Sequence, residues 1–153
     1  MTVFFEFEAD FVDSLRCIPM QVRYKLDTCG IKLRLSDWYQ ITQAEREALV
    51  ILPCSTDTEV QAYQKYLQEL ILERTGTPVA TLPIDSYPQW LDAHNLPVSV
   101  QEKAQELGII ITLSQWANLT SLQRFALIKL SRPGHENKNF GRAIAEFKLV
   151  NNQ

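Results

Sequence analysis

The sequence predicts a mainly α fold, a single domain over residues 1–153 made of two fused helix–extended–turn–helix repeats with pseudo-twofold symmetry and room for a small β element. Three observations lead to this prediction. Aligning the chain with itself at an offset of 78 residues pairs residues 19–52 with 97–130 without a gap, and 13 of the 34 pairs are identical. Capping boxes mark several helix starts. A chain of 153 residues is also long enough for one buried core.

Each copy begins with an amphipathic helix that ends at a glycine. Apolar side chains recur at positions i, i+4 and i+7, which is the spacing of one helix face. These side chains are Val22, Leu26 and Cys29 in the first copy and Val100, Ala104 and Leu107 in the second. Gly30 and Gly108 follow, and glycine suits the residue after a helix because that residue usually takes a positive φ.

An extended segment comes next in each copy. Residues 31–35 and 109–113 place apolar side chains at every second position, as a strand with one buried face does. We expect the two segments to pair with each other about the pseudo-twofold axis. The stretches MTVFFEFE and EFKLV at the two ends of the sequence supply a second candidate strand pair.

Capping residues then indicate two helices in each copy. We expect Ser36 and Ser114 to cap a short helical turn that carries a tryptophan. Thr42 and Thr120 open the longer helix that follows, because each has Glu or Gln three residues later and so forms a capping box.

Between and after the copies the sequence indicates further helices. Thr56, with a glutamate three residues later, opens a helix that reaches about Arg74 and is stopped by Gly76. Three prolines within residues 77–88 predict an ordered connector, followed by a short helix near residues 90–94. The apolar residues of a final helix are Phe140, Ile144 and Phe147.

Composition and charge exclude several classes of function. The net charge is −3 and acidic and basic residues are interspersed, which argues against a nucleic-acid partner. No stretch reaches the ~18 apolar residues of a membrane span. The first residues carry Glu6, Glu8 and Asp10 among their aromatics, which a secretory signal does not tolerate. We therefore expect a cytoplasmic protein without a membrane partner.

The residue types that catalysis or metal binding needs are few and scattered. The chain has two histidines, His94 and His135, and three cysteines. Their spacing assembles neither a nucleophile with an oriented base nor a closed metal site. We expect no enzymatic activity, no cofactor and no metal, and we expect Cys17, Cys29 and Cys54 to be buried free thiols.

Two pairs of repeated residues are candidates for either binding or packing. Trp38 and Trp116 occupy matching positions, so they are either ligand platforms or duplicated core anchors, and the repetition favours the core. Arg46 and Arg124 lie one turn inside matching helices. We expect them to bond backbone carbonyls of a neighbouring segment rather than a ligand.

Two polar stretches remain as candidate binding sites. RPGHENKNF precedes the final helix, whose free N–H groups and dipole attract anions. Its candidate residues are Arg132, His135, Glu136, Asn137, Lys138 and Asn139. The alternative is a loop in which Asn137 or Asn139 only caps the helix. SLRCIPMQVRYKLD, residues 14–27, offers Arg16 and Arg23 together with Lys25, and its alternative is an ordinary amphipathic helix with solvated basic side chains.

The same two stretches resemble a known family. FEADFVDSLRCIPMQVRYKLDTCGIKL and QRFALIKLSRPGHENKNF are similar to the cyanobacterial nitrate reductase associated proteins, over about residues 4–149. Members are encoded near genes for assimilatory nitrate reductase and for molybdopterin synthesis. The resemblance implies an accessory factor that supports production of active reductase. The composition agrees, since three scattered cysteines cannot ligate an iron–sulfur cluster by themselves.

Three functional hypotheses follow from the resemblance. The first is a maturation or assembly factor that binds the nitrate reductase polypeptide or the molybdenum cofactor machinery, and holds the reductase open while its cofactor enters. The second is a small-molecule binding protein for the anionic molybdopterin cofactor or another phosphate-bearing ligand, held by Arg132, His135 and Lys138 at the start of the last helix. The third, a catalyst that uses His135 and Glu136, lacks any supporting arrangement in the sequence.

Overall fold

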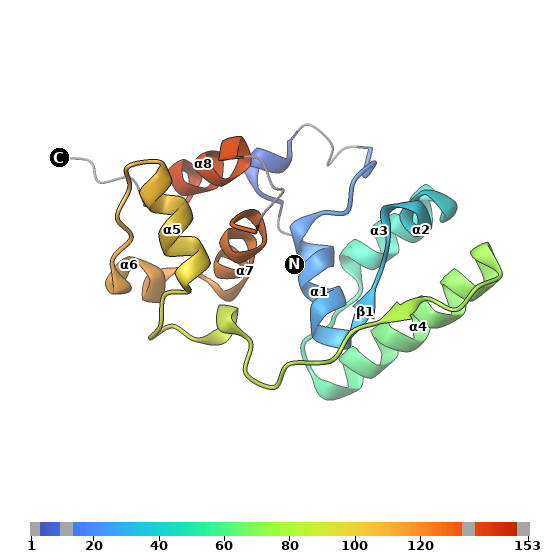
Figure 1. Ribbon diagram of the computed structural model, residues 1–153. Coiled ribbons are helices and arrows are strands. Elements are labelled where there is room, and N and C mark those ends of the chain that lie inside the picture. The colour runs from blue at the N-terminus through green and yellow to red at the C-terminus, as the bar shows by residue number, and fades with distance from the viewer. Residues whose placement is uncertain (1–3, 10–13, 133–136, 150–153) are drawn as a thin grey trace. The chain divides into compact units, whose positions relative to one another are not determined.

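The computed structural model describes residues 4–9, 14–132 and 137–149, with the side chains of Asn137 and Lys138 left out. Within these residues the chain forms eight α-helices, two short 3₁₀ helices and one two-stranded sheet (Figure 1). The predicted mainly α fold class and its small β element are confirmed. No helix among the described residues has the length and apolar character needed to cross a membrane.

The chain divides into two compact units, each holding one copy of the repeat. Unit 1 comprises Met1–Phe4 and Glu8–Asp85, and unit 2 comprises Phe5–Phe7 and Ser86–Gln153. The 3₁₀ helix η1, Glu6–Glu8, contributes residues to both. The single domain and its pseudo-twofold axis stay predictions.

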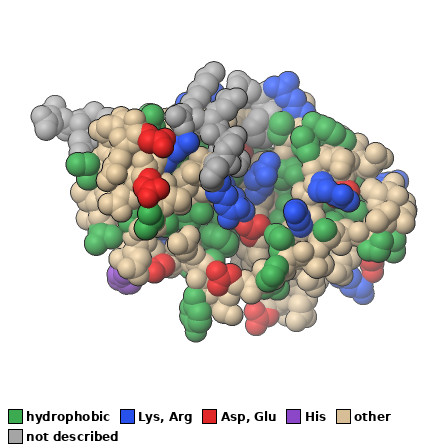
Figure 2. Space-filling view, in the orientation of Figure 1, with side chains coloured by type: hydrophobic (Ala, Val, Ile, Leu, Met, Phe, Trp, Pro, Cys, Tyr) green, Lys and Arg blue, Asp and Glu red, His purple; other side chains and the backbone are tan. Residues whose placement is uncertain are grey.

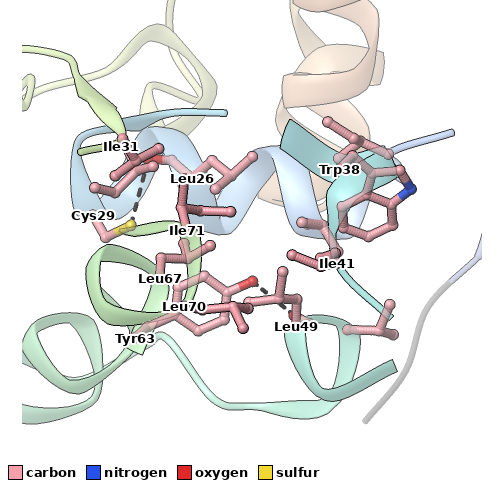
Figure 3. Packing of buried hydrophobic residues seen from close by; sticks show 14 of the residues in the cluster. Leu26, Cys29, Ile31, Trp38, Ile41, Leu49, Tyr63, Leu67, Leu70 and Ile71 are labelled. Atoms are coloured by element: carbon pink, nitrogen blue, oxygen red, sulfur yellow. Dashed lines mark hydrogen bonds between the residues drawn. The ribbon is translucent and has the colours of Figure 1, made fainter. Parts of the chain in front are cut away.

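Unit 1 is built around contacts of α1 with its neighbours. Its elements are α1 (Met20–Cys29), β1 (Ile31–Lys32), α2 (Leu35–Gln40), α3 (Gln43–Ile51), α4 (Asp57–Thr75) and β2 (Ala80–Thr81). Helix α1 packs against α3, α4 and β1, and α4 also contacts α2. The labelled core residues in Figure 3 are Leu26, Cys29, Ile31, Trp38, Ile41, Leu49, Tyr63, Leu67, Leu70 and Ile71.

Unit 2 is built around α7. Its elements are η2 (Gln89–Leu91), α5 (Val98–Glu106), α6 (Leu113–Asn118), α7 (Ser121–Leu130) and α8 (Asn137–Glu146). Helix α7 packs against η2, α5 and α8, and the ring of Trp90 meets that of Phe125 edge to face. Phe140 and Ile144 of α8 are fully buried and Phe147 nearly so, as the predicted final helix requires.

The two copies fold locally in the same way. Helices α1, α2 and α3 begin at residues 20, 35 and 43, and α5, α6 and α7 begin 78 residues later at 98, 113 and 121. The helix order and spacing within each repeat therefore match the sequence alignment.

Most predicted helix ends are confirmed. Thr42, Thr56 and Thr120 are N-cap residues, and each forms a capping box with the residue three positions later. Gly30 and Gly76 follow α1 and α4 with a φ of 76°. The predicted short helix near residues 90–94 is present as η2, which begins one residue earlier, at Gln89.

The predicted caps at Ser36 and Ser114 are wrong. Helices α2 and α6 begin two residues earlier, with Arg34 and Thr112 as their N-cap residues. In α6 the Thr112 side chain accepts a hydrogen bond from the backbone N–H of Gln115 at 3.1 Å, and the Gln115 amide oxygen accepts from the Thr112 N–H at 2.9 Å. This reciprocal pair fixes the start of the helix because it satisfies two backbone donors at once.

The predicted strand pairings are also wrong. Segment 31–35 does not pair with 109–113; instead β1 is antiparallel to β2, with Ile31 opposite Thr81. The connector that follows α4 lies beside β1, and the N–H of Leu82 extends the pairing by donating to the carbonyl of Gly30 at 2.8 Å. The end stretches form no strand pair within the described residues either, since residues 6–8 are a 3₁₀ helix. The rings of Phe5 and Phe7 pack on Phe147 instead.

Candidate functional site

The polar segment predicted to bind a partner leads into α8. Arg132 is exposed and comes shortly after α7. His135 and Glu136 lie outside the described residues. Helix α8 begins at Asn137, so Asn137 and Asn139 lie in its first turn. The interpretation in which one of them caps the helix stays a prediction, because the segment before the helix lies outside the described residues. The first backbone N–H groups of such a helix have no partner within it, which keeps the anion-binding hypothesis physically sound.

The two arginines of the first stretch are held differently. Arg16 is exposed in the segment before α1. Arg23 is half-buried in α1, and its Nε donates a hydrogen bond to the carbonyl of Ile18 at 3.1 Å. Burial lowers the pKa of Arg23, and the nearby Cys17 and Glu8 partly oppose that shift. Arg23 is therefore integrated into the fold, and Arg16 is the more accessible of the two cations.

A buried carboxylate fixes the start of the same helix. Glu8 is almost fully buried, and its Oε2 accepts a hydrogen bond from the backbone N–H of Met20 at 2.8 Å. Met20 is the first residue of α1, so the carboxylate satisfies one of the free N–H groups there and lies at the favourable end of the helix dipole. No local sequence pattern predicts this contact, because the partners are twelve residues apart.

Lys25 joins α1 to the end of α3. Its Nζ donates to the carbonyls of Val50 at 2.6 Å and Leu52 at 2.7 Å, which belong to the last turn and C-cap of α3. The same Nζ lies 5.8 Å from the centroid of the Tyr63 ring. The interpretation as a solvated helix face is wrong for Lys25, because its ammonium satisfies carbonyls that have no partner within their own helix.

Two thiols lie next to this lysine. Cys29 is the last residue of α1, and Cys54 lies in the segment between α3 and α4. Both are free and buried, as predicted, whereas Cys17 is only partly buried. The Cys29 and Cys54 thiols lie close enough to shift each other's pKa, so the cysteines are not all scattered as the sequence spacing suggested. A separation of 25 positions matches no thiol motif, and only the helix packing reveals the pair.

A small cleft opens beside Cys29. It has a volume of about 340 Å³ and is lined by Cys29, Asp57, Val60, Gln61, Gln64 and Ile84. The Nε2 of Gln64 donates to the backbone carbonyl of Cys29 at 2.9 Å, which ties the start of α4 to the end of α1. The cleft is at the small end of the range for ligand pockets.

The repeated tryptophans are core residues and the repeated arginines bond backbone carbonyls, as predicted. Trp38 and Trp116 are fully buried, and their indole N–H groups donate to backbone carbonyls at 2.6 Å and 2.9 Å. Arg46 and Arg124 donate from Nε to the carbonyl of the tryptophan in their own copy, at 3.1 Å in both cases. These four residues are therefore structural.

No group of three or more His, Cys, Asp or Glu side chains is placed to hold a metal ion among the residues that the structure describes. His94 follows η2, and its backbone N–H donates to the carboxylate of Asp92 at 2.9 Å. On the face in Figure 2, basic, acidic and hydrophobic side chains are interspersed.

Comparison with known proteins gives one result that bears on function. The family model of the conserved nitrate reductase-associated protein matches residues 4–147. No curated protein and no solved structure matches the chain.

Proposed function

Because the chain belongs to the family of conserved nitrate reductase-associated proteins, we propose that it is an accessory factor that binds the polypeptide of assimilatory nitrate reductase and helps to produce the active enzyme. On this proposal the chain carries out no reaction itself. It acts as a maturation or assembly factor by holding a segment of the reductase before its cofactor is in place.

The observation that carries the binding step is a segment of unit 2 that belongs to no helix or strand. In unit 1 the segment after the first repeat helix forms β1 and pairs with β2. The matching segment of unit 2, residues 109–112, has no strand paired with it among the described residues. We infer that this segment accepts one strand of a partner polypeptide through backbone hydrogen bonds.

The side chains of this segment also suit a polypeptide partner. Leu107, Ile110 and Leu113 are all exposed, and the side chain of Ile110 has 71% of its surface accessible. The residue of the first copy at the position of Ile110 is Lys32, a solvated cation. The repeat therefore does not need an apolar side chain at this position for its own packing, and grouped exposed apolar side chains are typical of interaction surfaces.

The polar segment that leads into α8 belongs to the same unit. Arg132 and the first turn of α8 offer charged and N–H donors to the partner, and an apolar centre with polar surroundings is the usual composition of a protein interface. Arg16 and Arg23 belong to unit 1, and we assign them a secondary part at most in this interaction.

Substitution of Ile110 tests the proposal. Ile110→Lys installs the residue type that the first copy carries at this position, and the variant should lose binding to the reductase apoprotein while its melting temperature stays nearly unchanged. Ile51→Lys is the matched control, because Ile51 in unit 1 is also 71% exposed. Binding is measured by titration with purified apoprotein, and function by nitrate reductase activity in cells that lack the native protein. Equal binding by both variants and the parent would refute the assignment of this segment.

A second set of variants separates the protein-binding proposal from its alternative. The combined variant Arg132→Ala, His135→Ala and Glu136→Ala should weaken apoprotein binding without a large change in stability. Titration with molybdopterin alone serves as the other arm. Tight cofactor binding that this variant abolishes, together with no binding to apoprotein, would favour the small-molecule function.

A further inference from the structure

We propose that Cys29 and Cys54 are a redox-active pair that a peroxide oxidises to an intramolecular disulfide within unit 1. This site is separate from the partner-binding residues of unit 2 and does not depend on the function proposed above.

Packing of α1 brings the two sulfur atoms to the same place. The Sγ of Cys29 lies 3.6 Å from the carbonyl oxygen of Leu26, and the Sγ of Cys54 lies 3.7 Å from that of Lys25. These two carbonyls belong to consecutive residues of one helix. The two thiols are also close enough to shift each other's pKa, which places them next to each other beside this turn of α1.

The two cysteines differ in the backbone that holds them. Cys29 ends a helix and is followed by Gly30 in the left-handed conformation. Cys54 lies in an irregular segment between Ile51, where α3 ends, and Asp57, where α4 begins. Only one partner is therefore fixed in a helix, and the other can adjust its position to reach disulfide geometry.

The surroundings assign different roles to the two sulfurs. The pKa of Cys54 is lowered, first by the interaction with the neighbouring Cys29 thiol and also by the Lys25 ammonium. The same interaction between the thiols, together with burial, raises the pKa of Cys29. The thiolate is the reactive form of cysteine, so Cys54 is the nucleophile and Cys29 is the thiol that resolves the product.

A small oxidant reaches the pair at Cys54, which keeps 7% of its surface exposed. Cys29 has 0% exposed and lies beside the cleft of about 340 Å³ together with Gln61 and Gln64, and as the resolving thiol it needs no contact with the oxidant. The surrounding core side chains exclude large reagents, so we assign a peroxide as the oxidant rather than another protein.

The chemistry balances with peroxide as the only added reagent. The Cys54 thiolate attacks one peroxide oxygen and breaks the O–O bond, which yields a sulfenic acid and hydroxide, and hydroxide takes up a proton to become water. The Cys29 sulfur then attacks the Cys54 sulfur and displaces the hydroxyl group, which leaves as water with the Cys29 thiol proton. Two thiols and one hydrogen peroxide thus give one disulfide and two water molecules.

Thiol mapping of the full-length protein tests the proposal. The reduced protein is freed of reductant, treated with a small excess of hydrogen peroxide and alkylated after denaturation. We expect the loss of two of the three thiols, a mass lower by two hydrogen atoms and one tryptic cross-linked pair that contains Cys29 and Cys54. Trypsin separates these residues because Lys32, Arg34 and Arg46 lie between them. A disulfide that includes Cys17 or joins two chains would overturn the proposal, as would three thiols that stay free.

Variants check the roles of the two cysteines. Cys17→Ser is the matched control and should form the disulfide like the parent. Cys29→Ser should stop at a sulfenic acid on Cys54 that dimedone traps, whereas Cys54→Ser should give no dimedone adduct on Cys29. The reverse labelling pattern would exclude Cys54 as the nucleophile. Circular dichroism establishes that each variant is folded, and the mapping of the parent protein stands whether or not a variant folds.

Discussion

The repeat offers an internally matched pair of substitutions, Arg124→Met and Arg46→Met. Arg124 has only 8% of its surface exposed and donates four hydrogen bonds to backbone carbonyls, at 3.1, 2.9, 3.3 and 2.8 Å. Arg46 is half-buried and donates two, at 3.1 and 3.3 Å, while its guanidinium lies 5.6 Å from the centroid of the Trp38 ring. Methionine keeps most of the aliphatic stem, so the substitution removes chiefly the guanidinium.

The expected costs follow from the numbers of bonds and the burial. A hydrogen bond to a charged group contributes about 1.5–3 kcal/mol net, which gives an upper limit of about 6–12 kcal/mol for Arg124. Carbonyls have a second lone pair and some can regain water, so we expect a loss nearer the roughly 3–5 kcal/mol measured when a buried charged contact is broken. For Arg46 we expect about 1–3 kcal/mol, because it makes half as many bonds and solvent reaches it.

Urea unfolding followed by tryptophan fluorescence and circular dichroism measures both losses in free energy of unfolding. If the two units unfold separately, each substitution should shift the transition of its own unit, since Arg46 lies in unit 1 and Arg124 in unit 2. Equal costs for the two variants, or a cost below about 1 kcal/mol for Arg124→Met, would show that the carbonyl contacts do not hold the repeat together.

Three further predictions concern the stability of the fold. Trp38→Ala and Trp116→Ala should each cost about 3–5 kcal/mol in denaturant unfolding, because both side chains are fully buried; native-like stability in either would contradict a core role. Gly30→Ala should cost more than Gly108→Ala. Both glycines have a positive φ, but a Cβ at Gly30 would lie 2.9 Å from a backbone oxygen and one at Gly108 would meet nothing within 4 Å; equal melting temperatures would argue against that clash. A hydrogen bond from Arg74 lowers the pKa of Glu45 in the folded state, so the stabilising contribution of this pair is present above pH ~4.5 and lost as pH falls through the folded pKa. Glu45→Gln should therefore flatten the acid side of the stability curve slightly, and parallel curves for the variant and the parent would count against the Glu45–Arg74 pair.

Local sequence signals predicted the helices well. A capping threonine satisfies N–H groups within three residues of itself, so Thr42, Thr56 and Thr120 determine helix starts without help from the rest of the fold. Ser114 was predicted as the cap of α6, but Thr112 is also a capping residue type. Gln115 determines which of the two caps the helix, because it can complete a capping box only with Thr112.

Contacts between distant residues were beyond the reach of the sequence pattern. Alternating apolar residues predict an extended segment but not its partner, and β1 pairs with residues about fifty positions later instead of with its repeat. Lys25 resembles any solvated lysine in the sequence, and its role becomes visible only when α1 packs against the end of α3. The thiol pair depends on the same packing. The binding residues His135 and Glu136 stay predictions.

The two copies of the repeat can carry different residues, and therefore different chemistry, at positions that do not take part in the repeated packing. Positions inside the copies are constrained because Trp38 and Trp116 are both fully buried and bonded through their indole N–H groups. Those constraints end after the last helix of each copy. At an offset of 78 residues, Cys54 after α3 corresponds to Arg132 after α7, so one cysteine of the thiol pair and the first residue of the polar segment occupy the same position. This position lies outside the repeated residues 19–52 and 97–130, so the residue type there can differ between the copies without a change in the repeated helices. On our proposals, Cys54 contributes to redox chemistry in unit 1 and Arg132 to partner binding in unit 2.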